Sequence, residues 1–284
     1  MDQKIAIFSD VHGNLTALEA VYQDALHHGV TDFWFLGDLF SPGPGADDLW
    51  QLFLEMNPSI CIRGNWEDLL INSANGVLST NKASKIYFAK LNQTLIKRLP
   101  DSVITTIASW PLHFKRKIGV FTIGCSHNLP NLNHGQDLYP TKPQENFDGL
   151  FVEDKEIDIA LYAHVHHPIM RYGSNEQIII NPGSVGQPFS QRSVYQADLR
   201  ARYAILNFDD TGLPDIDFRK VAYDHELEYM RARSVNLPYL DLYQEQLKTG
   251  HVHSHDQALL AQINKKRGYE EDVLGYNQRM KKGL

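Results

Sequence analysis

The first 63 residues alternate between short apolar runs and amphipathic segments, and this alternation constrains the fold more than any other feature of the chain. The apolar runs have the length of buried strands; they are residues 4–8, 33–36 and 59–63. Between them, residues 15–28 and 46–56 repeat apolar side chains at helical spacing, and Asn14 and Gly29 suit the two ends of the first helix. Consecutive strands joined by helices pair in parallel through right-handed crossovers. The sequence therefore predicts an α/β fold.

The rest of the chain departs from this alternation in two places. Residues 66–117 have helical periodicity and predict a helical insertion, and the chain after residue 223 is helical and highly charged, with one helix expected over 258–272. Strand patterns lie between these regions, at residues 118–124, 159–163, 177–181, 203–208 and 215–223. We expect these later strands to form a second sheet. The predicted organisation is a domain over residues 1–223 followed by a helical C-terminal extension over 224–284.

Charge and cysteine content exclude several classes of protein. The formal charge of -7, from 27 Lys and Arg against 34 Asp and Glu, argues against binding to duplex nucleic acid by backbone neutralisation. Cys61 and Cys125 both lie in apolar strand patterns, which disfavours a disulfide framework and indicates a reducing compartment. The start of the sequence does not resemble a signal peptide, and no run of about 18 apolar residues is present. We therefore expect a cytoplasmic protein with no membrane segment; self-association stays open.

Polar side chains follow five of the predicted strands, at the edge where open α/β sheets place their ligand sites. They are Asp10, His12, Asp38, Asn65, His127, His164 and His166. Two pairs are spaced two residues apart, so in extended backbone the members of each pair would project to the same side, roughly 6.5 to 7 Å apart. We expect each pair to face one metal cluster.

The chemistry of these groups favours a transition-metal centre. Two carboxylates, four imidazoles and one amide oxygen suit Mn, Fe, Zn, Co or Ni better than Ca or Mg, which prefer oxygen throughout. Seven groups exceed what one tetrahedral ion takes, and two ions about 3.5 to 4 Å apart, bridged by a carboxylate, would use them economically. Taken singly, Asp38 could end its strand and Asn65 could be a turn residue. The whole ordered set favours a metal site.

The ordered motifs resemble those of the calcineurin-like metallophosphoesterase superfamily, whose pattern runs D-x-H, G-D, G-N, a histidine after a strand, and G-H-x-H. The matching segments are residues 10–12, 37–38, 64–65, 126–127 and 163–166, with Ala163 in place of the glycine. The resemblance covers about residues 4–222. Within the superfamily, the segment N-P-G-S-V-G at 181–186 is similar to one in small bacterial phosphodiesterases.

The resemblance implies a fold and a set of ligand roles. The fold would be a two-sheet β-sandwich flanked by helices, in a four-layer αββα arrangement. One metal would be held by Asp10, His12 and His166, the other by Asn65, His127 and His164, and Asp38 would bridge them. The nucleophile would be a metal-bound hydroxide, so no side-chain nucleophile is needed. The cofactors would be two divalent or mixed-valence ions, with Mn or Fe favoured over Zn, Ni or Co.

Trp66 departs from the family pattern, because many relatives have a histidine there that can protonate the leaving alcohol. Indole is a hydrogen-bond donor that does not ionise near neutrality. This predicts a substrate with a good leaving group, such as a nucleotide or a dinucleoside polyphosphate. Three residues are candidate substrate contacts: Asn14 at a helix start, Trp66 as a stacking platform and Arg192 near a distal phosphate. Their alternative roles are a helix cap, packing and a solvated surface charge.

Three other functions remain open at this level. The same scaffold could serve a phosphomonoesterase or a protein phosphatase, because fold does not determine substrate. A non-catalytic interaction module without metals is disfavoured by the full set of candidate ligands. An amidohydrolase would place a His-x-His pair early in the chain, whereas here that pair is His164 and His166.

Overall fold

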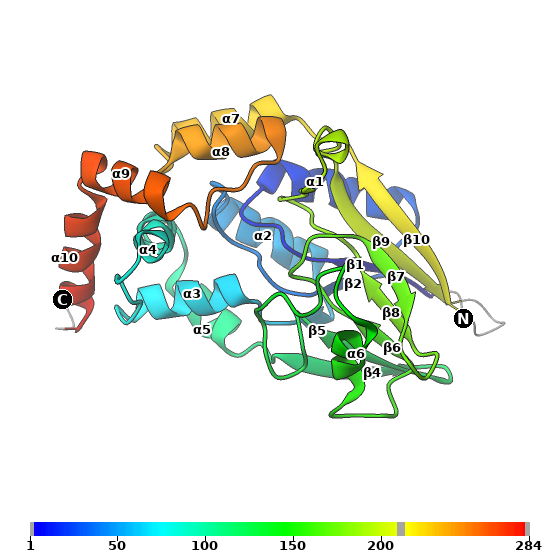
Figure 1. The fold of residues 1–284 in the computed structure, drawn as a ribbon. Helices are drawn as coiled ribbons and strands as arrows, with labels where there is room; N and C mark the ends of the chain where they lie inside the picture. The colour runs from blue at the N-terminus through cyan, green and yellow to red at the C-terminus, as the bar shows by residue number, and fades with distance from the viewer. Residues whose placement is uncertain (1–2, 209–213, 282–284) are drawn as a thin grey trace.

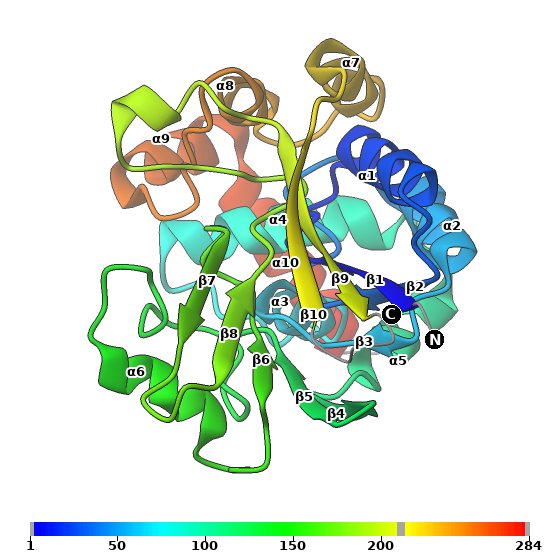
Figure 2. The same ribbon diagram turned by 90° about the vertical axis from the view of Figure 1, so that its right-hand side faces the viewer.

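Two five-stranded β-sheets pack face to face at the centre of the fold, and helices cover their outer surfaces (Figures 1 and 2). The computed structural model of the chain describes residues 3–208 and 214–281. The first sheet contains, in spatial order, β10 (Pro214–Val221), β9 (Ala201–Phe208), β1 (Gln3–Phe8), β2 (Asp32–Phe35) and β3 (Ile60–Cys61). The second contains β4 (His113–Ile118), β5 (Phe121–Ser126), β6 (Ile159–Leu161), β8 (Ile178–Asn181) and β7 (Ile169–Tyr172).

The predicted strand–helix–strand unit is confirmed. Strands β1, β2 and β3 pair in parallel, and they are joined by α1 (Leu15–His27) and α2 (Asp47–Met56). Asn14 caps α1, since its side-chain oxygen accepts the Ala17 N–H at 3.0 Å. Gly29 follows the helix with a φ of +70°, a conformation that glycine adopts without strain.

The expected membership of the second sheet is wrong for two strands. The patterns at 203–208 and 215–223 correspond to β9 and β10, and β9 pairs antiparallel with β1 in the first sheet. This pairing satisfies the edge of β1 that faces away from β2, which would otherwise present unpaired backbone groups. The second sheet instead gains β4 and β7, whose exposed positions and charged side chains hide the strand pattern. Strand β4 also occupies the end of the range expected to be helical.

The core is divided by the alternation of side chains along each strand. In β1, Ile5 and Ile7 point into the layer between the two sheets, whereas Ala6 and Phe8 point towards the helices. The outer face of the first sheet is covered by α1 and α2 (Figure 2). The outer face of the second is covered by α6 (Gln144–Asp148) and the short 3-10 helix η1 (Gly149–Phe151).

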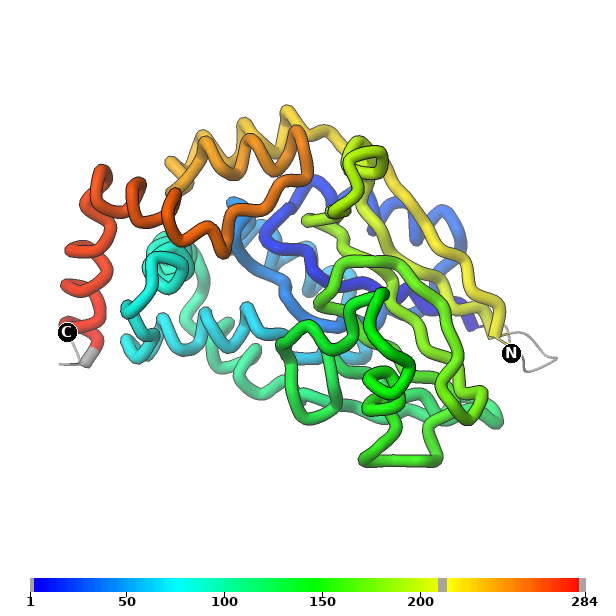
Figure 3. The backbone as a smooth tube through the Cα atoms, viewed as in Figure 1, coloured from blue at the N-terminus to red at the C-terminus, as the bar shows by residue number. Residues whose placement is uncertain are grey.

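The helical insertion and the C-terminal extension pack together at the end of the molecule far from the start of β1 (Figure 3). The insertion contains α3 (Asn65–Ala74), α4 (Ala83–Ile96) and α5 (Asp101–Ala108). The extension contains α7 (His225–Ser234), α8 (Leu240–Thr249), α9 (Gln257–Arg267) and α10 (Tyr269–Lys281). The single helix expected over 258–272 is wrong, because Gly268 has a φ of +65° and separates α9 from α10. A further 3-10 helix, η2 (Ser193–Tyr195), precedes β9.

Within the described residues, none of the helices combines the length and apolar character needed to cross a bilayer.

Candidate metal centre

The seven candidate ligands come from both sheets and lie at or just beyond the carboxyl ends of strands. They are Asp10 and His12 after β1, Asp38 after β2, Asn65 at the start of α3, His127 after β5, and His164 and His166 after β6. The loops that carry them meet where the two sheets face each other. Two groups of possible metal ligands form there, and in each group the ligand atoms lie within 4.8 Å of one another.

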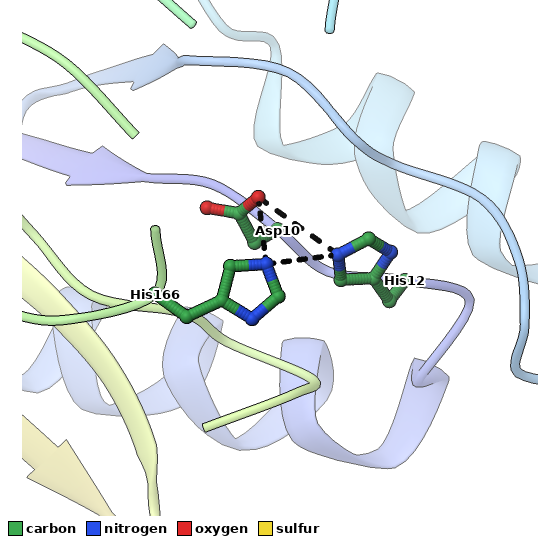
Figure 4. Close-up of side chains that lie close together, drawn as sticks. All are labelled: Asp10, His12 and His166. Atoms are coloured by element: carbon green, nitrogen blue, oxygen red, sulfur yellow. Dashed lines mark hydrogen bonds and ion pairs between the residues drawn. The ribbon is translucent and has the colours of Figure 1, made fainter. Parts of the chain in front are cut away.

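The first group consists of Asp10, His12 and His166, all buried (Figure 4). The Nε2 atom of His166 lies 3.2 Å from Asp10 Oδ1 and 3.2 Å from His12 Nε2. Asp10 Oδ2 accepts the Ser9 hydroxyl at 2.8 Å and the His164 backbone N–H at 3.2 Å. Asp10 Oδ1 is buried and has no hydrogen-bond partner within residues 3–208 and 214–281. Since buried polar atoms are normally paired, this oxygen is suited to receive a cation.

The second group consists of Asp38, His127 and His164. The Nε2 atom of His127 lies 3.3 Å from Asp38 Oδ2 and 3.2 Å from Asn65 Oδ1. Asn65 therefore adds an amide oxygen to this group. The rings of His127 and His164 meet edge to face, with centroids 5.2 Å apart.

Asp38 lies between the two groups. Its Oδ2 atom is 3.3 Å from His127 Nε2 in the second group and 3.8 Å from His12 Nε2 in the first. Its Oδ1 atom accepts the backbone N–H of Trp66 at 2.8 Å. One oxygen is therefore anchored to the start of α3, and the other is directed between the imidazoles.

Backbone carbonyls orient three of the four imidazoles. The Nδ1–H groups of His12, His127 and His166 donate to the carbonyls of Ser41, Leu36 and Gln187, at 2.8, 2.7 and 2.7 Å. Each of these bonds fixes the ring and leaves Nε2 as the inward-facing nitrogen. Metal-binding histidines use their second nitrogen in the same way.

The expectation of extended backbone at the paired ligands is wrong. Asp10, His12, His164 and His166 all have φ angles between 51° and 67°, in the left-handed region. Such angles cost about 1 to 3 kcal/mol each in a non-glycine residue and persist where surrounding structure holds them. Because the chain turns at each of these residues, His164 and His166 reach different groups although only one residue separates them.

The family model for the calcineurin-like phosphoesterase superfamily domain matches residues 3–210 of this chain. The chain belongs to this superfamily. The resemblance inferred from the motifs is thereby confirmed, and so is the two-sheet sandwich flanked by helices.

One relative and two solved structures are similar to the chain over most of its length. The chain is 27% identical over 246 residues to an uncharacterized protein of Methanocaldococcus jannaschii, covering 82% of this chain and 93% of that protein. A metallophosphoesterase from Sphaerobacter thermophilus superposes with a TM-score of 0.64 at 25% identity, over 88% of this chain and all of that chain. A hypothetical protein from Pyrococcus horikoshii has a TM-score of 0.69 at 18% identity, over 87% and 98% of the two chains, and shares the fold.

The carboxylates of this calcineurin-like centre stay ionised despite their burial. Burial raises the pKa of Asp10, but the imidazoles of His166, His127 and His12 outweigh it and hold that pKa below its ordinary range. Burial likewise raises the pKa of Asp38, and His127 and His12 bring it below the ordinary value. Two buried carboxylates therefore carry negative charge that a metal cation would neutralise.

The four imidazoles divide into two electrostatic classes. Burial lowers the pKa of His127, but Asp38 and Asp10 outweigh burial and raise it to about 10. The pKa of His166 is also raised, because Asp10 outweighs the burial that lowers it. In contrast, burial lowers the pKa of His12 and of His164 to about 4 in each case, so both are neutral near pH 7 and ready to bind metal.

Glu67 connects the loop that carries Asp38 to the loop that precedes Asn65, a role that the sequence interpretation missed. Its side chain accepts the backbone N–H groups of Asp38, Leu39 and Gly64 at 2.8, 2.7 and 2.8 Å. Burial and the neighbouring Asp38 raise the pKa of Glu67 to about 7. A glycine is required at position 64, since an added Cβ would lie 2.2 Å from Asp38 Oδ1. The signal in the sequence was the acidic residue three positions after Gly64, the spacing of a capping box.

The three candidate substrate contacts lie in different environments. Asn14 is buried, and its amide donates to the Gly186 carbonyl and to the Tyr223 hydroxyl, while its oxygen caps α1. Trp66 is half-buried and packs edge-on against His12 on one side and Phe88 on the other, with centroids 5.1 and 5.0 Å apart. Arg192 is exposed in the loop that follows β8. The structure thus displays the cap and packing roles of Asn14 and Trp66.

Proposed function

We propose that the chain is a dinuclear metal-dependent phosphoesterase that hydrolyses phosphodiester or phosphoanhydride bonds, with nucleotides or dinucleoside polyphosphates as its substrate class. The position of Asp38 carries this proposal. Its Oδ2 atom is within 3.8 Å of one imidazole from each ligand group, as a bridging carboxylate would be. Two ions held side by side are the arrangement that metallophosphoesterases need for in-line displacement at phosphorus.

The ligand roles follow from the two groups. We assign Asp10, His12 and His166 to one ion and Asn65, His127 and His164 to the other, with Asp38 shared. The mixed oxygen and nitrogen donors suit Mn or Fe, and also Zn, Co or Ni. When bound, such ions would activate water for attack and neutralise charge on the phosphoryl oxygens. The protein's own contribution is to hold the ligands rigidly, through the carbonyl contacts of the imidazoles and through Glu67.

Trp66 supports a substrate with a good leaving group. The indole N–H does not ionise near neutral pH, so Trp66 cannot supply the proton that a poor leaving group needs. Its ring also packs at a steep angle against the rings of His12 and Phe88. A phosphate leaving group, as in a phosphoanhydride, departs without that proton more readily than an alkoxide does. This argument favours phosphoanhydrides and activated diesters over alkyl monoesters.

The direct test is a metal and substrate matrix. Metal-stripped protein is reconstituted with Mn, Fe, Zn, Co or Ni and assayed with bis(p-nitrophenyl) phosphate, p-nitrophenyl phosphate and a diadenosine polyphosphate. We expect two ions per chain by elemental analysis, and higher kcat/KM for the diester and the diadenosine compound than for the monoester. A preference for the monoester would instead support a phosphomonoesterase or protein phosphatase. Failure to bind any metal would support a non-catalytic module.

A further inference from the structure

The C-terminal extension, here its described residues 224–281, contacts the loops of the first ligand group through buried polar side chains. Helix α7 packs against α1, which begins directly after the loop that carries Asp10 and His12, and α8 packs against α7 (Figure 1). Most of the extension is highly charged at its surface. The two contacts described below are buried, and they connect the extension to the metal centre.

The first contact runs from α8 to His166. Gln246 of α8 is 8% exposed, and its Oε1 accepts the side-chain N–H of Gln187 at 2.9 Å. The backbone carbonyl of Gln187 accepts His166 Nδ1–H at 2.7 Å. The backbone N–H of the same Gln187 donates to Ser184 Oγ at 2.8 Å. The Ser184 hydroxyl in turn donates to the Asp10 carbonyl at 2.8 Å. Gln246 thus holds the residue that orients His166.

The second contact runs from α7 to the start of α1. Glu228 is fully buried, and its Oε2 accepts both the backbone N–H and the hydroxyl of Thr16, at 3.1 and 2.6 Å. Its Oε1 accepts the Tyr243 hydroxyl at 2.9 Å. A buried carboxylate is costly unless several donors satisfy it, and here three do so. They tie α7 and α8 to the start of α1.

Among the described residues, the second ligand group has no such hydrogen bonds to the extension. His127 is oriented by the Leu36 carbonyl at the end of the first sheet, and Asp38 by the start of α3. Within the described part of the chain, hydrogen bonds join the extension to four places: the segment around Gln187, helix α1, helix α4 and the loop before α4. The two groups therefore differ in their dependence on the extension.

We propose that Gln246 and Glu228 are positioning residues through which the C-terminal extension sets the metal affinity of the group formed by Asp10, His12 and His166. This inference rests on the proposed dinuclear centre. The contacts act on the carbonyl that orients His166 and on the helix start that ends the Asp10–His12 loop. Losing an outer partner of a metal ligand commonly weakens metal binding about 10- to 100-fold. The second group, whose ligands are oriented by Leu36 and α3 rather than by the extension, would retain its affinity.

The test measures each ion separately. In a His164→Ala background the remaining ion reports the first group, and in a His166→Ala background it reports the second. Gln246→Met keeps the side-chain volume and removes the acceptor. Binding is measured by titration calorimetry of metal-stripped protein with Mn. We expect Gln246→Met to weaken Mn binding about tenfold in the His164→Ala background and to leave it unchanged in the His166→Ala background. Gln246→Glu retains an acceptor oxygen for Gln187 and should restore the affinity.

The matched control is Asn264→Leu. Asn264 is another buried amide of the extension, but it accepts the Tyr239 hydroxyl and donates to the Ala83 carbonyl, away from the metal loops. The Asn264→Leu variant should lower thermal stability without changing Mn affinity. The nearly isosteric variant Glu228→Gln tests the second contact, because it places an amide N–H against one of the groups that donate to Glu228. It also keeps the proposal testable if Gln246→Met does not fold.

The outcomes separate the two proposals. If the wild-type chain binds none of Mn, Fe, Zn, Co or Ni, the proposed function fails. If it binds two ions and Gln246→Met and Glu228→Gln behave like Asn264→Leu, or weaken both ions equally, the positioning role is wrong and the extension only stabilises the fold. Selective weakening of the first ion, restored by Gln246→Glu, supports it.

Discussion

The two ligand groups of the metal centre are enclosed to different degrees and held by different parts of the molecule. In the first group, Asp10, His12 and His166 are 0%, 1% and 6% exposed. In the second group, Asp38 and His127 are 1% and 0% exposed, but His164 is only partly buried. No ring hydrogen bond orients His164 within the described residues, whereas both imidazoles of the first group donate to carbonyls.

The carbonyls of the first group are themselves supported by helices outside the sandwich. The Ser41 carbonyl orients His12, and the Ser41 hydroxyl donates to Asn92 of the helical insertion at 3.2 Å. Gln187 orients His166 and is bonded to Gln246 of the extension. In the second group, the Leu36 carbonyl at a strand end orients His127, and Glu67 of α3 holds the loop that carries Asp38. The helical insertion thus supports both groups, since Asn65 and Glu67 belong to α3, whereas the hydrogen bond from Gln246 of the extension reaches only the first.

Asp38→Asn should have the largest effect, because Asp38 is the residue that the two groups share. Replacing the carboxylate by an amide removes the charge that would attract both ions. We expect metal content to fall for both groups, and kcat/KM to fall by more than about 100-fold, since even the loss of an outer contact costs about 10- to 100-fold. Elemental analysis and hydrolysis of bis(p-nitrophenyl) phosphate measure the two effects. Full metal content with unchanged turnover would remove Asp38 from the site.

His166→Ala and His164→Ala should each affect one group. We expect each variant to retain one ion of the two, because the other group keeps its own ligands. The ion retained in His164→Ala should bind more tightly than the one retained in His166→Ala, since the first group is more deeply buried and better oriented. Titration of metal-stripped protein with Mn gives both affinities. Equal affinities would show that the difference in burial has no energetic consequence.

Metal binding to the second group should release a proton over a wide pH range. The pKa of His127 is raised to about 10 in the metal-free chain, and a metal displaces the proton from its ring. Affinity at this group should therefore rise about tenfold per pH unit from neutral pH up to about 10. Calorimetry in buffers of different ionisation enthalpy counts the released protons. A count near zero at pH 8 would mean that His127 is already neutral.

The same shift predicts how the stability of the metal-free chain depends on pH. The folded-state pKa of His127 lies above the ordinary 6.5, so its pairing with Asp38 stabilises the fold fully below about pH 6.5. That contribution is lost as the pH rises to about 10. The pKa values of Asp10 and Asp38 are lowered, so their contribution is present above about pH 3.9 and is lost at more acid pH. Thermal denaturation of the metal-free protein across this range measures both losses.

Trp66→Phe should have the smallest effect, since the indole packs against His12 without being a candidate ligand, and the backbone N–H that bonds Asp38 is kept. We expect a loss of stability of about 1 kcal/mol from reduced packing against Phe88. KM should change more than kcat, and the pH profile should keep its alkaline limb, because indole does not act as an acid. A lost alkaline limb would show that position 66 takes part in proton transfer.

Local sequence was sufficient to name the candidate ligands and the first half of the fold. Strand–helix alternation reflects periodicities of a few residues, so the parallel order of β1, β2 and β3 could be predicted directly. Asp10, Asp38, His127 and the later histidines follow strands within a few positions, and the structure brings their side chains together. Strands such as β4 and β7 could not be predicted, because their half-exposed, charged positions give no apolar run.

The sequence by itself determined which side chains meet, because each ligand motif occupies a short segment that follows a strand. The family resemblance implied the two groups, but only the tertiary structure decided how they form: His164 and His166 separate because the chain takes left-handed turns at both, and those turns are held by contacts with distant loops. It also decided that β9 and β10 complete the first sheet and that Gln246 lies against Gln187. These pairings join residues far apart in the chain, and their free energy comes from burial and hydrogen bonds that exist only after folding.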